Sequence, residues 1–446
     1  MNKRLLKVIS SCALLGTMMM TSGCGGSGSG SKDTLLVWTF TDELKLMIED
    51  NYKKDKNPDY KIDVKVFELN NLNQKLRQAM NSKKGLPDLV ALEAKVVLNY
   101  IDNDILLNLN DIVESGLTDN MYSYTKDLVT VNGNCYALSW QATPGGFFYR
   151  TDLAQKHLGL SSPEEVQTRL STWEGFLNTA KDLKEKGVKM VSSTVEPVKA
   201  FLGQREQGWV DANNNFIIDN TLMKYDAETN TFGDYNCFDV VKTIHQAGYT
   251  NQTAERAPAW YDDMSGESVF GYFMSAWGLS YELKANSKKA GDWGFVEGPG
   301  NFYNGGTWLA GLSTSNMKEE CKDIIRYFTT DEQFLKERAL NSGDFMNNKK
   351  IMEEIKNNPS TESLEFLGGQ NHYEVMYNIA ENINGNLITK YDSNIDSIFE
   401  GIVGDYAMQE KAYAQTIQGA VTTFENNIKS QYGRVLTVTP MFSGTK

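Results

Sequence analysis

Hydrophobic and polar positions follow two different periods along residues 35–92. A nearly continuous apolar run at residues 35–40 is typical of a buried strand. The apolar positions that follow recur every three or four residues, as on one face of a helix: Leu44, Met47, Ile48 and Tyr52. Strand, helix and strand patterns then come in turn: residues 62–66, then Leu72, Leu76 and Met80, then residues 87–92. The predicted order of elements is therefore βαβαβ.

This order predicts an α/β protein with a parallel sheet, because strands joined through a helix run parallel with a right-handed crossover. Open parallel sheets bind ligands in the crevice at the carboxyl ends of their strands. The aromatic and acidic residues near those ends are candidate ligand contacts: Trp38, Phe40, Asp42, Glu43 and Glu93. Such residues suit a sugar, whose C–H groups pack on an aromatic ring while its hydroxyls donate to carboxylates. Alternatively, Trp38 and Phe40 are core aromatics and Asp42 caps a helix.

The N-terminus carries the pattern of an exported lipoprotein. Three basic residues precede an apolar stretch of the length of a signal-peptide core: Lys3, Arg4 and Lys7, then residues 8–20. Residues 21–24, Thr-Ser-Gly-Cys, resemble the bacterial lipobox, in which the cysteine is lipidated and begins the mature chain. We expect a signal peptide at residues 1–23, a lipid anchor on Cys24 and a flexible tether at residues 24–32. An ordinary secretory signal with a chance cysteine is the alternative.

Charge and hydropathy argue against two classes of function. The chain of 446 residues has 44 Lys plus Arg and 57 Asp plus Glu, and loss of the three basic residues of the signal would leave a net charge of −16. That acidity argues against nucleic acid or anionic lipid as the partner. No second segment of about eighteen apolar residues follows. Any transport role would therefore be that of a component outside the membrane.

The cysteines and histidines show no metal-binding spacing. Beyond the signal and Cys24, the chain keeps Cys135, Cys237 and Cys321, which we interpret as buried free thiols, with one disulfide as the alternative. Residues 211–219 imitate part of a calcium loop, but Phe216 stands in place of the turn glycine, so we interpret this segment as a β-hairpin turn. P-loop, HExxH and GxSxG motifs are absent from the sequence, and the GxGxxG match that begins at Gly23 has no strand before it and no helix after it. We expect no catalytic residue, no metal and no cofactor.

Five segments carry a family resemblance: residues 136–140, 148–153, 270–277, 293–295 and 305–310. Together with the lipobox and the first strand and helix, their order and spacing resemble the extracellular solute-binding proteins of carbohydrate ABC importers, the maltose-binding-protein-like family 1. The likeness spans almost the whole mature chain. One departure is Ser139, at a hinge position where the family commonly shows proline.

The resemblance implies a type II fold of two α/β lobes, each a mainly parallel sheet flanked by helices, with the ligand cleft at the hinge. The N-terminal lobe would comprise residues 33–140 and 266–328. The C-terminal lobe would comprise residues 141–265 and 329–446. Closure of the lobes around a ligand would be a hinge motion.

The resemblance also assigns further ligand contacts. Trp277 would stack on a sugar, Gln141 would lie at the hinge floor, and the carboxylate of Glu196 would contact hydroxyls. Other aromatic residues are assigned more loosely: Trp209, Trp260, Trp308 and Tyr391. For Trp308, an alternative role is to support the turn that precedes it.

The implied function is capture of a carbohydrate, with an oligosaccharide as the expected ligand. The binding protein would be a monomer that shifts toward a closed form when ligand contacts both lobes. Its partners would be a pair of permease subunits and a cytoplasmic ATPase, and its location the outer face of the cell membrane of a Gram-positive bacterium. A competing hypothesis is a surface glycoside hydrolase that uses Glu43 and Glu93 as acid and base. Two more hypotheses are a binding protein for a peptide or another non-sugar solute, and an adhesin or scaffold without a small ligand.

Overall fold

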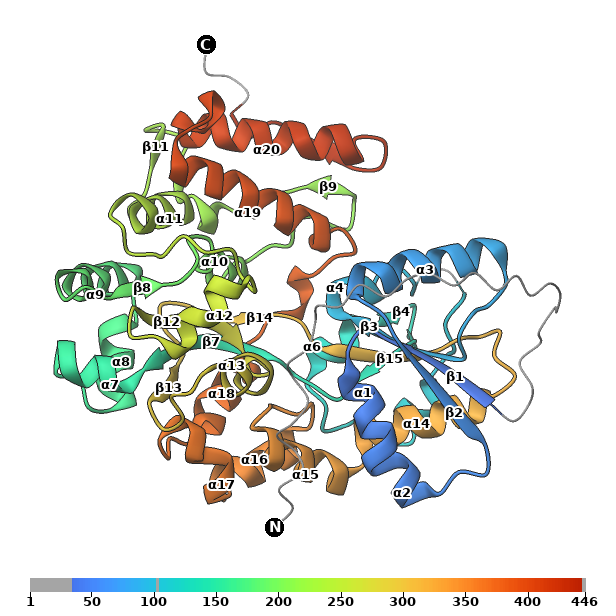
Figure 1. The fold of residues 1–446 in the computed structure, drawn as a ribbon. Coiled ribbons are helices and arrows are strands. Elements are labelled where there is room, and N and C mark those ends of the chain that lie inside the picture. Colours follow the sequence, from blue (N-terminus) through green and yellow to red (C-terminus); the bar gives the residue numbers. More distant parts are fainter. Residues whose placement is uncertain (1–33, 102–103, 443–446) are drawn as a thin grey trace, which may run out of the picture.

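The computed structural model describes residues 34–101 and 104–442 and contains two sheets that lie side by side, each flanked by helices (Figure 1). The predicted signal peptide, the lipidation site at Cys24 and the tether lie outside the described residues. No helix in the described part of the chain is long and apolar enough to cross a membrane.

The first sheet has the strand order β2-β1-β3-β15-β6. Its strands are β1 (Thr34–Thr39), β2 (Lys61–Val66), β3 (Leu89–Glu93), β6 (Leu138–Ser139) and β15 (Thr307–Gly311). Strand β1 pairs parallel with both β2 and β3, which confirms the predicted βαβαβ arrangement. Strand β15 pairs antiparallel with β3 and β6, so the completed sheet is mixed.

Helices cover both faces of the first sheet. They are α1 (Asp42–Met47), its continuation through the π-helical turn η1 (Ile48–Tyr52) into α2 (Lys53–Lys56), α3 (Leu69–Ser82), α4 (Ala94–Val97), α5 (Asn110–Glu114), α6 (Ser123–Asp127) and α14 (Lys318–Thr330). In Figure 1, α3 and α4 lie above this sheet and α1 and α14 lie below it. The apolar stripes found in the sequence are buried on these helices, as at Leu44, Leu72 and Leu76.

The second sheet has the strand order β13-β7-β12-β8, and β14 pairs with β7. Its strands are β7 (Pro144–Arg150), β8 (Lys189–Val191), β12 (Val269–Ser275), β13 (Trp293–Val296) and β14 (Phe302–Tyr303). Only β12 and β8 run parallel; β7 is antiparallel to β12, β13 and β14. The expectation of a mainly parallel sheet in each lobe therefore needs correction. Strand β7 carries the chain out of the first sheet and β12 carries it back, so these neighbours must run in opposite directions.

Both faces of the second sheet are buried, and every residue of β7 and β12 is inaccessible or nearly so. Along β7, Phe147 and Tyr149 face one core whereas Phe148 faces the other, as the two-residue period of a strand requires. The first face is covered by α7 (Thr151–Leu153), η2 (Ala154–Leu158), α8 (Pro163–Leu170), α9 (Trp173–Glu185), α10 (Val198–Gly203) and α11 (Cys237–Gln246). The other is covered by α12 (Pro258–Ser265), η4 (Leu279–Leu283) and α18 (His372–Glu381), and α13 (Lys284–Asn286) continues from η4.

The C-terminal helices divide between the two cores. Buried residues of α15 (Glu332–Ser342), α16 (Lys349–Asn357) and α18 belong to a core that runs from the first sheet to one face of the second, where α18 packs on β7 and β13. The last helices, α19 (Asp392–Met408) and α20 (Ile417–Tyr432), pack in the core of the second sheet. The short helix α17 (Thr361–Leu364) lies beside α15 (Figure 1). The lobe boundaries stay a prediction.

Short two-stranded pairs complete the fold: β4 (Thr130–Val131) with β5 (Asn134–Cys135), β10 (Tyr225–Asp226) with β11 (Thr231–Phe232), and β9 (Asn215–Phe216) with β16 (Thr437–Val438). Val210 and Phe216 form an antiparallel bridge, and Asp211 Oδ1 accepts the backbone N–H groups of Asn213 and Asn215. The calcium-like segment is therefore a hairpin turn, as predicted. The carboxylate of Asp211 accepts hydrogen bonds from the backbone of its own turn.

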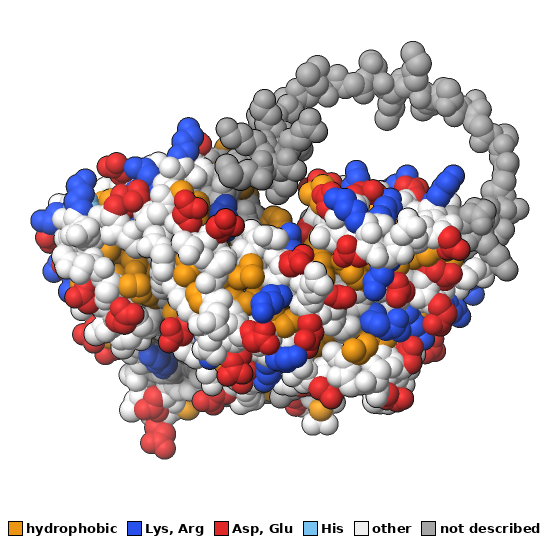
Figure 2. Space-filling model, turned by 90° about the horizontal axis from the view of Figure 1, so that it is seen from below, with side chains coloured by type: hydrophobic (Ala, Val, Ile, Leu, Met, Phe, Trp, Pro, Cys, Tyr) orange, Lys and Arg blue, Asp and Glu red, His pale blue; other side chains and the backbone are white. Residues whose placement is uncertain are grey.

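The three cysteines of the described chain, Cys135, Cys237 and Cys321, are buried free thiols, which confirms their interpretation from the sequence. Burial raises the pKa of each thiol. On the face drawn in Figure 2, acidic and basic side chains are interspersed, and neither sign forms a continuous field. This face offers no basic patch of the kind that binds nucleic acid.

Candidate ligand-binding site

A cleft of about 440 Å³ opens at the carboxyl ends of β1 and β3, where the sequence predicts a ligand site. The loop that leads into β15 forms its other wall. The cleft is lined by Phe40, Thr41, Glu43, Leu69, Glu93, Gln141, Arg256, Trp277, Tyr281, Glu282, Asn304, Gly305, Gly306 and Thr307. The structure thus brings together five of the predicted contacts: Phe40, Glu43, Glu93, Gln141 and Trp277.

Glu43 lies in the first turn of α1, and its carboxylate is held in place. Arg338 Nη2 on α15 donates to Glu43 Oε1 at 2.7 Å and lies at the same distance from the hydroxyl of Tyr281. This pairing leaves the Glu43 side chain only 5% exposed. Beside it, the buried hydroxyl of Thr41 has no hydrogen-bond partner within the described residues. The wall therefore offers an oriented carboxylate and an unused hydroxyl to a polar ligand.

Gln141 lies at the floor of the cleft, just after β6. Its Nε2 donates to Asp344 Oδ2 at 2.6 Å, and Asp344 Oδ1 accepts the backbone N–H of Phe345. Burial raises the pKa of Asp344 to about 6. The buried acid fixes the orientation of the Gln141 amide at the point where the chain leaves the first sheet.

Glu93 ends β3 and caps the following helix. Its Oε2 accepts the backbone N–H of Lys95 at 2.9 Å, at the N-terminus of α4. Glu93 pairs with Thr307 across β3 and β15, so two cleft residues are held by the register of the sheet. Burial raises the pKa of this carboxyl above its ordinary value.

Trp277 follows β12, and its ring is held at the edge and on one face. Its Nε1 donates to the carbonyl oxygen of Asn304 at 3.0 Å. The guanidinium of Arg256 lies over the ring, 5.1 Å from its centre, and Arg256 also pairs with Glu282 at 3.2 Å.

The turn beside Trp277 requires glycine. Gly305 and Gly306 both have positive φ, at 76° and 101°. A Cβ atom on Gly305 would lie 2.9 Å from Trp277 Nε1, and one on Gly306 would lie equally close to the ring of Trp308. The glycine pair therefore lets the backbone approach both tryptophans.

The sequence profile of the family described as bacterial extracellular solute-binding protein matches residues 48–359. The chain belongs to this family. A lactose-binding protein of Rhizobium radiobacter is 23% identical over 347 residues, which cover 72% of this chain and 75% of that protein.

Solved structures of other binding proteins share the fold. An ABC transporter associated binding protein from B. animalis subsp. lactis, in complex with beta-1,6-galactobiose, has a TM-score of 0.70 at 19% identity, over 91% of this chain and 99% of that one. A galacto-N-biose-/lacto-N-biose I-binding protein from Bifidobacterium longum has a TM-score of 0.70 at 16% identity, over 92% and 100%. The sugar-binding protein MalE from Xanthomonas citri has a TM-score of 0.68 at 16% identity, over 90% and 98%. The predicted two-lobed binding-protein fold is thereby confirmed.

Four predicted contacts of this solute-binding protein lie in its interior. Each is at most 2% exposed and has a polar partner inside the protein: Glu196, Trp209, Trp260 and Trp308. Trp260 Nε1 donates to Glu196 Oε1 at 2.7 Å. Trp209 Nε1 donates to Asp396 at 2.6 Å, and Trp308 Nε1 donates to the carbonyl oxygen of Thr125 at 3.2 Å. The structure does not bring these side chains to the cleft, and Trp308 lies under the glycine turn, as its alternative role requires.

Three more predicted contacts lie outside the lining of the cleft. Trp38 packs edge-on against Phe67, 5.2 Å between ring centres. Asp42 is exposed in the first turn of α1, where its charge suits the helix N-terminus. Tyr391 packs against Tyr432 beside α20. Ligand contact by these residues stays a prediction.

Five residues of the cleft wall were not predicted from the sequence: Arg256, Tyr281, Glu282, Asn304 and Thr307. The doublet Gly305-Gly306 was the one local signal, because two adjacent glycines before a strand mark a turn with unusual backbone angles. Arg256 precedes α12 and Glu282 lies in η4, and neither segment has a pattern that predicts a site. Within the described residues, no group of three His, Cys, Asp or Glu side chains is placed to hold a metal ion.

Proposed function

We propose that this solute-binding protein captures a sugar or short oligosaccharide in the cleft and delivers it to an ABC importer. The observation that carries the proposal is the setting of Trp277, a partly exposed ring that shares one cleft with Glu43, Glu93 and Gln141. An aromatic face beside several fixed hydrogen-bond acceptors matches a pyranose, which has an apolar face and a rim of hydroxyls. The ligands named for the relatives support the same class: lactose, beta-1,6-galactobiose and lacto-N-biose.

The proposed mechanism is a shift between open and closed forms. Ligand that contacts the first sheet through Glu43 and Glu93 and the second through the segment of Trp277 stabilises the closed form by its differential affinity. A hydroxyl missing from the ligand leaves a buried acceptor unpaired, at a cost of about 1–3 kcal/mol. The site therefore discriminates sugars by their hydroxyl pattern.

The cellular setting follows from the N-terminal pattern and the family. We place the protein on the outer face of the cell membrane of a Gram-positive bacterium, anchored through lipid on Cys24. Its partners are a pair of permease subunits driven by a cytoplasmic ATPase, and the binding protein itself acts as a monomer. Tethering keeps the loaded protein close to its importer.

Calorimetric titration of the purified protein with a panel of disaccharides, starting with lactose, beta-1,6-galactobiose, lacto-N-biose and maltose, tests the proposal. We expect saturable binding of at least one sugar, accompanied by a change in tryptophan fluorescence and by recovery of intact ligand. Cleaved ligand would instead support the hydrolase that uses Glu43 and Glu93. If no sugar of the panel bound and a peptide or another solute did, the carbohydrate assignment would be overturned.

A further inference from the structure

A second, smaller cavity adjoins the cleft, and Asn304 lines both. Its volume is about 80 Å³, against about 440 Å³ for the cleft. A cavity of about 150 Å³ is needed to hold a benzene ring, so this inner compartment has no room for a pyranose ring. A sugar that fills the cleft therefore meets this narrower compartment on the side of Asn304.

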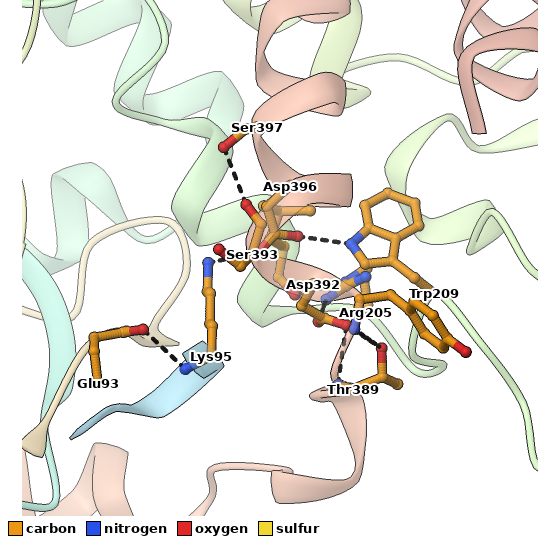
Figure 3. Close-up of polar contacts among 11 residues, drawn as sticks. Glu93, Lys95, Arg205, Trp209, Thr389, Asp392, Ser393, Asp396 and Ser397 are labelled. Atoms are coloured by element: carbon orange, nitrogen blue, oxygen red, sulfur yellow. Dashed lines mark hydrogen bonds and ion pairs between the residues drawn. The ribbon is translucent and has the colours of Figure 1, made fainter. Parts of the chain in front are cut away.

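An ion pair between elements of the two cores lines the inner compartment, and Figure 3 shows its two residues. Lys95 Nζ donates to Asp396 Oδ2 at 2.5 Å, and the two side chains are 27% and 7% exposed. Lys95 belongs to α4, whose buried neighbours pack in the core of the first sheet. Asp396 belongs to α19, whose buried face packs in the core of the second sheet. The pair therefore joins the two halves of the molecule at the inner end of the cleft.

The Asp396 side chain is held in the second core by contacts that do not involve Lys95. Trp209 Nε1 donates to the other carboxylate oxygen, Oδ1, at 2.6 Å. Trp209 is itself fixed, because it is fully buried and the guanidinium of Arg205 lies 4.4 Å from its ring centre. Arg205 in turn lies 3.7 Å from the carboxylate of Asp392, one turn before Asp396. These contacts therefore orient the Asp396 carboxylate toward α4 without any contribution from Lys95.

The Lys95 end is tied to the cleft. Its backbone N–H is bound by Glu93, whose side chain lines the cleft, so the two residues form one rigid corner at the start of α4 (Figure 3). A ligand that contacts Glu93 meets Lys95 as the next side chain along the wall. A chain that extends from the cleft past Glu93 into the inner compartment would therefore meet Lys95.

We propose that the Lys95–Asp396 ion pair ends the cleft and limits the ligand to a short saccharide. The inference rests on the proposed sugar-binding function and adds to it a specificity-determining residue. A saccharide with further rings would have to separate a lysine and an aspartate that are paired and largely withdrawn from water, which disfavours long chains against short ones.

The test is the ratio of dissociation constants for a tetrasaccharide and a disaccharide of one series, measured by calorimetry with galacto-oligosaccharides and beta-1,6-galactobiose. We expect the wild-type protein to bind the tetrasaccharide at least tenfold more weakly. Lys95→Ala, which removes the side chain that lines the compartment, should reduce that ratio at least fivefold. Lys95→Arg, which keeps the charge, should retain the wild-type ratio and controls for loss of fold.

A matched control is Lys411→Ala, which breaks the 2.7 Å pair with Asp405 on the outer side of the same helix and should leave the ratio unchanged. Equal loss of affinity for both chain lengths in Lys95→Ala would mean that the pair only stabilises the closed form or contacts the sugar directly, and it would overturn the length limit. An unchanged ratio in that variant, or tight wild-type binding of the tetrasaccharide, would do the same. A wild-type protein that binds no sugar in the wider panel overturns the proposed function itself, which is a distinct result.

Discussion

The guanidinium of Arg256 covers one face of the Trp277 ring, at 5.1 Å, while Arg256 Nε pairs with Glu282 Oε1 at 3.2 Å. Arg256 is 56% exposed, so this cover is supported by two weak contacts and not by packing. The ring is held at its edge by Asn304. Trp277 is therefore a fixed aromatic surface with one face loosely screened by a cation that a ligand can displace.

We predict that Trp277→Ala weakens sugar binding at least tenfold, equivalent to about 1.4 kcal/mol, because the ring supplies the stacking surface of the cleft. The unfolding temperature should change little, since the side chain is partly exposed. Calorimetry and a thermal melt measure both quantities. The control is Tyr235→Ala, at an aromatic side chain that is 36% exposed and does not line the cleft. Equal affinity of Trp277→Ala and wild type would remove the stacking role.

The interior position of Glu196 leads to a different prediction. Its Oε1 accepts from Ser193 N and Trp260 Nε1, and its Oε2 accepts from Phe273 N. We predict that Glu196→Ala lowers the free energy of unfolding by about 2–4 kcal/mol, because three buried donors lose their acceptor. Glu196→Gln keeps the oxygen that serves Ser193 and Trp260 and should lower it by about 1 kcal/mol.

Denaturant unfolding measures these changes, and calorimetry measures ligand affinity alongside. Glu196→Gln should bind sugar within about threefold of the wild type, since the side chain does not line the cleft. A tenfold loss of affinity with unchanged stability would restore the ligand contact that the family resemblance assigns to this residue.

The contrast between Trp277 and the buried tryptophans shows what the sequence could reveal. Local patterns located β1 and β3, and the carboxyl ends of parallel strands meet at one edge, so Phe40, Glu43 and Glu93 could be predicted to share a site. A tryptophan, however, has the same sequence signature in a core as on a ligand. The partners that bury Trp209, Trp260 and Trp308 lie 187, 64 and 183 residues away along the chain, beyond any local pattern.

The same limit applies to Arg256 and Glu282. Arg256 precedes β12 and Glu282 follows it, so the position of both depends on the pairing of β12 with β7, a tertiary contact that no local period encodes. The antiparallel pairing of strands in the second sheet could not be predicted from the sequence for the same reason. The hinge-floor role of Gln141 could be expected, whereas its partner Asp344 lies 203 residues farther along.

The lipid anchor gives a prediction that is independent of the fold. Cys24→Ala removes the thiol that would carry the diacylglycerol thioether, and each buried methylene of the acyl chains contributes about 0.8 kcal/mol to membrane attachment. We predict that the variant moves from the membrane fraction to the culture medium while its sugar affinity stays unchanged. Cell fractionation and detergent partition measure the shift. Retention of the variant in the membrane fraction would contradict lipidation at this residue.

The stability of the protein should depend on pH through Asp344. Burial raises the pKa of this carboxyl from 3.8 to about 6 in the folded protein, so the folded state takes up a proton more readily than the unfolded chain. Above pH 6 the folded protein bears the cost of a buried charge. As the pH falls from about 6 toward 4 this cost disappears, and the contribution of Asp344 to stability improves by about 1 kcal/mol between pH 7 and pH 5.

Asp344→Asn removes this titration while keeping an oxygen that can accept from Gln141 Nε2. We therefore predict that the gain in stability from pH 7 to pH 5, measured by urea unfolding, is about 1 kcal/mol smaller in the variant than in the wild type. The variant should also be the more stable of the two at pH 8, because its buried amide carries no charge. Asp42→Asn, at an exposed position on α1, controls for loss of one negative charge. Parallel pH profiles for wild type and Asp344→Asn would contradict this prediction. They would mean that the Asp344 carboxylate is ionised in the folded state at no cost, because hydrogen bonds from the Gln141 amide and the N–H of Phe345 fully replace its hydration.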